Sequence, residues 1–155
     1  MPIARLQGEC VSAIGTAVVP ALAARYVARP DAESIGFVGA GRSGALTLWA
    51  LSKWFPDIQR YRAYDQSAAR LTAFVEHMAT LGLTVEAVSS FQDALVDADM
   101  GIVATTESEP YVTASEFKRG ALFMNVSLMD PTFDLVSAAD KIVVDDWHQS
   151  VHSDR

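Results

Sequence analysis

A glycine-rich turn between an apolar run and a helical run constrains this chain more than any other feature of its sequence. The turn reads GAGRSG, so that Gly39, Gly41 and Gly44 form the pattern G-x-G-x-x-G. The short apolar run SIGFVG leads into it, and ALTLWALSKWF after it repeats with the period of a helix. Strand, tight turn and helix in this order predict a dinucleotide-binding unit.

Each glycine of the turn has its own mechanical reason. The first permits the tight turn, the second lets the backbone approach a pyrophosphate, and the third allows helix and strand to pack closely. The pyrophosphate would bind N–H groups at the helix N-terminus, where the helix dipole also favours an anion. The predicted cofactor-binding residues of the turn are Gly39, Ala40, Gly41, Arg42, Ser43 and Gly44.

Asp65 ends the next predicted strand, RYRAYD, roughly 20 residues after the turn. A carboxylate there can accept both hydrogen bonds from the adenosine ribose diol, and it would repel a 2′-phosphate. We therefore predict NAD(H) as the cofactor, in preference to NADP(H). Two alternatives stay open: a turn needed only for backbone geometry, and an S-adenosylmethionine-dependent methyltransferase, which also has a glycine-rich first turn and an acidic residue after the second strand.

Strands and helices are expected to alternate along the chain. An N-terminal helix over 10–29, with Pro20 as a kink or boundary, carries apolar residues at helical spacing. The predicted fold is a Rossmann-type doubly wound α/β domain, with a mostly parallel six-stranded sheet in the order 3-2-1-4-5-6 and helices on both faces. Its strands are expected at 34–39, 60–65, 83–88, 100–106, 121–127 and 141–146, and its other helices at 45–55, 67–82 and 91–99.

The composition of the chain limits the classes of partner and the cellular location that we expect. With 12 basic and 19 acidic residues the net charge is −7, and without a cationic cluster we expect no nucleic-acid partner. No apolar run reaches the ~18 residues of a membrane span, and a secretory signal pattern is absent, so a cytoplasmic protein is expected. A single cysteine, Cys10, excludes an internal disulfide, and the His and acidic residues lack metal-ligand spacing, so we predict no metal site.

Polar residues follow the fourth and fifth predicted strands. Ligands in such sheets lie beyond the carboxyl ends of the strands, where the strand order reverses. We therefore expect Thr105 and Thr106 to line the nicotinamide half of the cofactor, with Asn125, Ser127 and Asp130 on the same side of the sheet. A simple polar loop before Pro110, and a turn-forming aspartate before Pro131, are the alternatives.

These segments resemble the ornithine cyclodeaminase/mu-crystallin family. The resemblance covers SAIGTAVVPALAARYVARPDAESIGFVGAGRSG, IVATTESEP, NVSLMD and VVDDWHQS, and so almost the whole chain. Within the family the chain looks most like the dehydrogenases that make 2,3-diaminopropionate for siderophores and peptide antibiotics. The resemblance implies an oxidoreductase of amino-acid metabolism that uses NAD: hydride leaves the α-carbon of an amino acid, and the resulting imine is cyclised or hydrolysed. It also implies that Asp130 is the catalytic acid/base and that Thr16 is a cofactor-binding residue.

Two departures from the family matter. Gly15 stands where the family has an arginine before Thr16, which removes a cation able to clamp a substrate carboxylate. The family is also about twice as long, so we expect residues 1–9 to be the last strand of a missing substrate domain and 10–155 to be the NAD-binding domain. We therefore expect little turnover by the isolated chain, a partner chain that carries the substrate domain, and a homodimer. The alternative is a non-catalytic NAD(H)-binding or interaction module.

Overall fold

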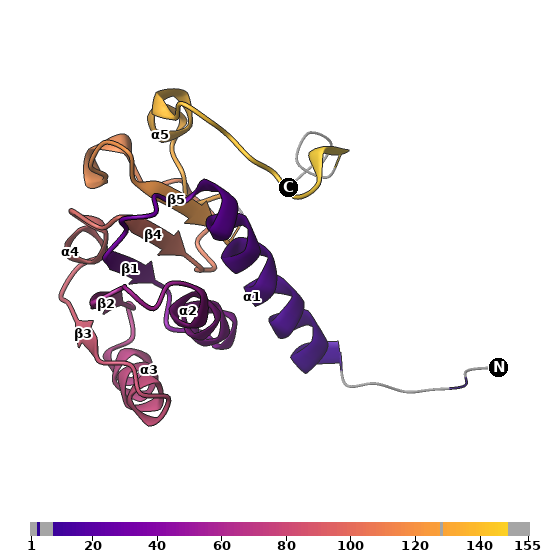
Figure 1. The fold of residues 1–155 in the computed structure, drawn as a ribbon, viewed down its shortest axis with the longest axis vertical. Coiled ribbons are helices and arrows are strands. Elements are labelled where there is room, and N and C mark those ends of the chain that lie inside the picture. The colour runs from indigo at the N-terminus through magenta and orange to yellow at the C-terminus, as the bar shows by residue number, and fades with distance from the viewer. Residues whose placement is uncertain (1–2, 4–7, 128, 149–155) are drawn as a thin grey trace.

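A computed structural model describes residues 3, 8–127 and 129–148 of the chain (Figure 1). Five parallel strands form one sheet, and their order is β3-β2-β1-β4-β5. The elements in chain order are α1 Gly8–Val27, β1 Ser34–Val38, α2 Arg42–Trp54, β2 Arg60–Tyr64, α3 Ala68–Thr80, β3 Val85–Ala87, α4 Phe91–Leu95, β4 Met100–Val103, the 3-10 turn η1 Ala114–Glu116, β5 Leu122–Asn125 and α5 Phe133–Ala138.

The strand order confirms the predicted doubly wound arrangement for the first five strands. All five residues of β1 and all four of β4 are buried, as expected for central strands of a parallel sheet covered on both faces. Ile35 and Phe37 of β1 pack into one apolar core with α1, α2 and α3. Val38 packs into a second core with α4 and with the segment that follows β4. The helices therefore cover both faces of the sheet.

Residues 141–146, predicted as a sixth strand, form no strand. Ile142 and Val143 are 62% and 61% exposed, and this part of the chain leads away from the sheet (Figure 1). A run of β-branched residues favours an extended backbone, but a strand also needs a neighbouring edge with which its N–H and C=O groups can pair. The sheet of the described residues accordingly ends at β5.

The N-terminal helix α1 begins at Gly8, so it includes the last residues of the strand predicted over 1–9; residues 1, 2 and 4–7 of that strand lie outside the described part of the chain. The helix continues through Pro20 to Val27 without a boundary. Its buried side is a row of alanines at helical spacing, which lets α1 approach α2 closely. These residues are Ala13, Ala17, Ala21 and Ala24.

The large apolar residues of α1 therefore face outward. Val11, Ile14, Val18, Leu22 and Tyr26 are all exposed, with exposed fractions from 44% to 80%. Among the described residues, no helix is long and apolar enough to cross a membrane.

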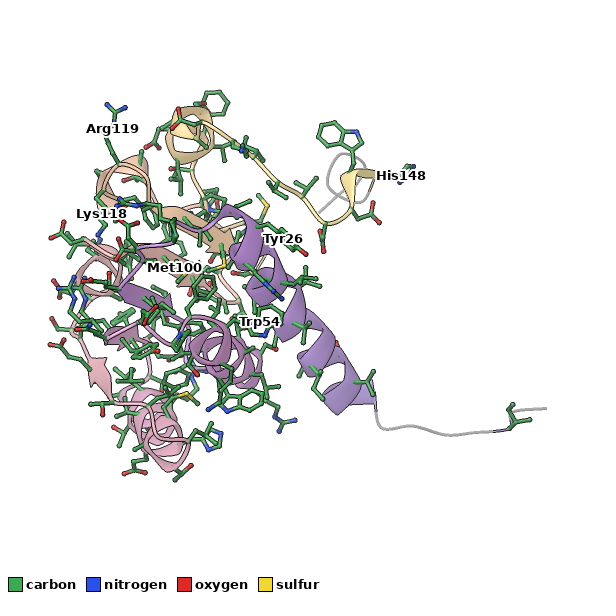
Figure 2. All side chains as sticks on the ribbon, in the orientation of Figure 1. Tyr26, Trp54, Met100, Lys118, Arg119 and His148 are labelled. Carbon is green, nitrogen blue, oxygen red and sulfur yellow. The ribbon has the colours of Figure 1, made fainter. Side chains whose placement is uncertain are left out.

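The amino-terminal ends of β1 and β4 are joined by a buried carboxylate. Asp99, which precedes β4, accepts hydrogen bonds from the backbone N–H groups of Glu33 and Ser34 and from the Ser34 hydroxyl. Lys118 closes the group with an ion pair of 2.7 Å to Asp99. Figure 2 shows Lys118 on the side of the molecule away from α1, with Met100 of β4 in the interior. These interactions hold the amino-terminal ends of β1 and β4 together. The polar residues of the candidate site lie at the opposite, carboxyl end of the sheet.

Candidate functional site

The glycine turn connects β1 to α2 at the carboxyl end of the sheet. Gly39 has a positive φ of 101°, and a Cβ there would lie 2.3 Å from the carbonyl oxygen of Ala104. Only glycine fits such a position without strain. A Cβ at Gly44 would lie 2.5 Å from the ring of Phe37, so glycine is required for α2 to pack on β1. These geometries match the turn and packing reasons predicted for the first and third glycines.

Gly41 differs from the other two glycines because the space where its Cβ would lie is empty. A Cβ there would meet no atom within 4 Å, and Gly41 is exposed at the N-cap of α2. Among the described residues this helix end shows no side-chain cap hydrogen bond, and the first intrahelical hydrogen bond runs from Ala45 N–H to the Gly41 carbonyl. Backbone N–H groups before that bond have no intrahelical acceptor, and the helix dipole adds a partial positive charge. A helix end of this kind is typical of anion-binding sites.

Asp65 directly follows β2, and its carboxylate holds the glycine turn by a hydrogen bond to the turn backbone. Its Oδ2 accepts the Ala40 N–H at 2.8 Å, and its Oδ1 accepts the Ser67 N–H at 2.8 Å. Arg70 adds an ion pair of 3.0 Å to Oδ1. Burial alone raises the pKa of Asp65, but the bonds from Ser67, Ala40 and Arg70 outweigh it, so that the pKa lies below its usual value. Asp65 is therefore held as a carboxylate at neutral pH.

A second polar cluster lies at the carboxyl ends of β4 and β5. The Thr105 hydroxyl donates to Oδ1 of Asp130 at 2.5 Å, and the Thr105 N–H donates to the Ser127 hydroxyl at 3.1 Å. Ser127 in turn donates to the Val103 carbonyl of β4. Asp130 is completely buried, and its Oδ2 has no hydrogen-bond partner among the described residues. A buried carboxylate oxygen without a donor is costly, and it marks the cluster as a candidate site.

Backbone pairing after β4 is what buries Asp130. Its carbonyl accepts the N–H groups of both Tyr111 and Val112, and Val112 pairs with Pro131 in a short parallel bridge. The Tyr111 ring packs edge-on against Phe91 with centroids 4.9 Å apart. Burial raises the pKa of Tyr111 to about 12, and the charge of Asp130 adds to the rise. Tyr111 therefore keeps its proton beside the carboxylate at any physiological pH.

A cavity of about 620 Å³ opens beside the glycine turn, between α2 and α3. Gly41 and Arg42 line one end of it together with Arg70, and Trp49, Phe74 and Leu81 line its apolar part. The ion pair of Arg70 with Asp65 thus lies at the boundary between the cavity and the turn. A ligand on the turn would meet cationic groups there in addition to the Asp65 carboxylate.

The structure brings together most of the residues predicted from the sequence, although not all. Thr105, Ser127 and Asp130 form one hydrogen-bonded cluster. Thr106 and Asn125 are exposed at the same strand ends. Thr16 is exposed on α1. The helix α1 lies on the side of the molecule toward which the arrows of β1, β4 and β5 point (Figure 1).

Sequence reasoning missed Arg70 and Tyr111. Asp65 and Arg70 lie five residues apart across the start of α3, outside the i, i+3 and i, i+4 spacings of helical ion pairs, so their spacing was no signal for this ion pair. The sequence also held no signal for Tyr111, since its place beside Asp130 depends on backbone pairing between separate segments. In the part of the chain that the structure describes, no group of three His, Cys, Asp or Glu side chains could hold a metal ion.

The model of the ornithine cyclodeaminase/mu-crystallin family matches residues 1–132. The chain belongs to this family. It is 29% identical to the N-((2S)-2-amino-2-carboxyethyl)-L-glutamate dehydrogenase of Staphylococcus aureus over 150 residues, which are 96% of this chain and 45% of that protein. This chain of the ornithine cyclodeaminase/mu-crystallin family therefore spans less than half the length of that curated relative.

Solved structures of relatives share the fold of this family member. The Δ1-pyrroline-2-carboxylate reductase of Thermococcus litoralis, in complex with NADH and L-proline, is 30% identical with a TM-score of 0.71; the match covers 76% of this chain and 36% of that one. An archaeal alanine dehydrogenase dimer with bound NAD is 25% identical with a TM-score of 0.71, over 79% of this chain and 38% of that one. The fold is thus a Rossmann-type domain of the ornithine cyclodeaminase/mu-crystallin family.

Proposed function

We propose that this chain is the NAD(H)-binding unit of an ornithine cyclodeaminase-like amino-acid dehydrogenase. The observation that carries the proposal is the open glycine turn beside the buried Asp65, at the same edge of the sheet as the Asp130 cluster. The relatives solved with NADH or NAD support the choice of cofactor.

The residues around the turn fit a dinucleotide because Gly41 is open and, among the described residues, the α2 N-terminus shows no side-chain cap. Backbone N–H groups of the turn bind the pyrophosphate, and the carboxylate of Asp65 accepts hydrogen bonds from the adenosine ribose while it holds Ala40. Thr16 contributes from α1. The turn residues in this role are Gly39, Ala40, Gly41, Arg42, Ser43 and Gly44.

The cluster at the ends of β4 and β5 serves the reacting end. Thr105 and Ser127 fix the backbone on the nicotinamide side, and Thr106 and Asn125 line it. When bound, the oxidised cofactor supplies the acceptor for a hydride from the α-carbon of an amino acid. Asp130 would take the proton that the substrate nitrogen loses as the imine forms. Its Oδ2 has no hydrogen-bond partner among the described residues, but it is buried and must become accessible to the substrate for this role. Cyclisation or hydrolysis of the imine completes the reaction.

Turnover by such an enzyme needs a substrate-binding half in addition to the cofactor-binding half. We propose that residues 1–9 belong to the end of a substrate domain, that 10–155 form the cofactor domain, and that a partner chain in the cytoplasm supplies the rest. Support comes from the share of the relatives that this chain spans, 45% in the staphylococcal dehydrogenase. The isolated chain turns over little, since orientation of the substrate and exclusion of water depend on both halves.

Calorimetric titration with NADH, and separately with NADPH, tests the cofactor assignment. We expect binding of NADH that is lost in Asp65→Ala and retained in the matched surface variant Asp57→Ala. If neither NADH nor NADPH binds, the assignment is contradicted.

Turnover is tested with ornithine, alanine and the N-linked amino-acid–glutamate conjugate named for the staphylococcal relative. Robust activity of the isolated chain would contradict the need for a partner.

One observation favours a second candidate, a non-catalytic NAD(H)-binding module. Gly15 is exposed on α1 with no atom within 4 Å of the place of its Cβ, at the position where the family resemblance predicts a substrate-binding arginine. Restoring the cation with Gly15→Arg separates the two functions once a substrate domain is added in trans. Gain of turnover supports the enzyme, and unchanged NADH binding without turnover supports the module.

A further inference from the structure

The carboxylate of Asp65 is largely neutralised within the chain. Its Oδ2 accepts the Ala40 N–H, and its Oδ1 accepts the Ser67 N–H and the side chain of Arg70. An ionised carboxylate has about four lone-pair sites, so these bonds occupy most of them. The Asp65 side chain is also only 6% exposed. Asp65 therefore presents little of its negative charge to a ligand at the end of β2.

Arg70 is the exposed member of this ion pair. Its Nε and Nη2 lie 3.1 and 3.0 Å from Oδ1 of Asp65, and 65% of its side chain is exposed to solvent. Arg70 lies in the first turn of α3, so the helix and the ion pair together hold its side chain in place. A guanidinium keeps its positive charge at any physiological pH. The group that faces solvent at this point is thus a positioned cation.

The cavity beside the glycine turn begins at this cation. Its volume is about 620 Å³, and Gly41, Arg42 and Arg70 are among the residues that line it. A dinucleotide whose pyrophosphate lies on the turn has its adenosine ribose at the end of the second strand. The 2′-position of that ribose is then next to the ion pair of Asp65 and Arg70, where the cavity offers room for a substituent. A planar guanidinium matches the oxygens of a phosphate in charge and in geometry.

We propose that Arg70 determines the cofactor specificity of this chain: it covers the Asp65 carboxylate and binds a 2′-phosphate, so that the site takes NADP(H) as well as NAD(H). This inference rests on the proposed function, because it places a dinucleotide on the glycine turn. The repulsion of a 2′-phosphate that Asp65 alone would cause is offset by the neighbouring guanidinium. NAD(H) still binds, since its 2′-hydroxyl needs no cation.

Calorimetric titration of the full chain with NADH and with NADPH tests the proposal through the ratio of the two affinities. We expect NADPH to bind within about tenfold of NADH. In Arg70→Gln the affinity for NADPH falls at least about tenfold more than the affinity for NADH, because both the cation and the cover of Asp65 are lost. A purely structural role of Arg70 would lower both affinities equally and leave their ratio unchanged.

Two further variants separate charge from structure. Arg70→Lys keeps the positive charge without the planar fork, so it is expected to recover part of the NADPH affinity that Arg70→Gln loses. Arg60→Gln is the matched control, since Arg60 is an exposed arginine at the amino-terminal end of β2, away from the glycine turn. It leaves the ratio of the two affinities unchanged.

The fragments 2′,5′-ADP and 5′-ADP test the phosphate contact without the nicotinamide half. Both are expected to compete with NADH, and the contribution of the 2′-phosphate to binding weakens as salt is raised, because an exposed ion pair is screened. NADPH binding more than about tenfold weaker than NADH binding, or an Arg70→Gln ratio equal to that of the wild type, would overturn the proposal. NADH binding without NADPH binding overturns this inference alone, whereas failure of both nucleotides to bind also overturns the proposed function.

Discussion

The backbone N–H of Ala40 donates a 2.8 Å hydrogen bond to Oδ2 of Asp65. This bond ties the middle of the glycine turn to the end of β2, and Ser67 and Arg70 bind the other carboxylate oxygen. Asp65 therefore shapes the turn in addition to any contact it makes with a nucleotide. Its two tasks can be separated by substitution.

Asp65→Asn is expected to reduce both stability and NADH binding. The side chain keeps its size, but its NH₂ group faces an N–H donor on one side, and a buried donor left unsatisfied costs about 1–3 kcal/mol. Chemical denaturation measures the stability and calorimetry the affinity. Arg70→Gln is the companion variant, since it loosens Asp65 but leaves the carboxylate in place; equal loss of NADH binding in both variants would argue against a direct contact of Asp65 with the ribose.

The glycines of the turn are expected to separate folding from binding. Gly44→Ala forces a Cβ to within 2.5 Å of the Phe37 ring, and overpacking of this kind costs about 1–3 kcal/mol of stability. Gly41→Ala meets open space, so its stability changes by less than about 1 kcal/mol, as for an N-cap replacement. Its methyl group lies where the pyrophosphate must approach, and NADH binding falls. Thermal unfolding and titration of both variants check this; strong binding by Gly41→Ala would place the nucleotide elsewhere.

The turn was predictable because its determinants are local. Gly39, Gly41 and Gly44 carry their conformational and packing reasons within a few residues of sequence, and the strand and helix around them have clear periods. The orientation of α1 was not predictable in the same way. Both of its faces are apolar, and the choice of alanines as the buried face follows from close approach to α2, which is a tertiary property.

Contacts between segments that are distant in the sequence also could not be predicted from it. Residues 141–146 have the composition of a strand but no edge to pair with among the described residues. Asp130 was expected beside the cofactor, whereas its burial by the backbone of Tyr111 and Val112 required the structure. The ion pair between Lys118 and Asp99 likewise joins a loop to the start of β4.

Thr105→Val is expected to destabilise the chain by about 1–3 kcal/mol, because it removes the donor to Oδ1 of Asp130 and leaves that buried carboxylate with neither oxygen bound by a side chain. Thr105→Ser keeps the hydroxyl and is expected to lose much less. The neighbouring exposed Thr106→Val provides the control for β-branched shape at the strand end. Urea denaturation of the three variants decides the point, and equal stability of Thr105→Val and Thr106→Val would show that the bond to Asp130 contributes nothing.

Acid is expected to destabilise the chain through Asp99. Burial acts to raise the pKa of this carboxyl, but the bonds from Lys118, Ser34 and Glu33 outweigh it and lower the pKa from 3.8 to about 2. Because the folded-state value lies below the unfolded one, the stabilisation is complete above about pH 4 and is lost as the pH falls toward 2. A shift of this size corresponds to roughly 2 kcal/mol.

Denaturation midpoints of the wild type and Asp99→Asn between pH 2 and pH 6 measure the effect: the variant is less stable at neutral pH and loses less on acidification. Asp65, whose pKa is also lowered, supplies a residual acid sensitivity in both proteins. Parallel curves for the two proteins would mean that Asp99 titrates normally and that its ion pair with Lys118 has no net effect on folding.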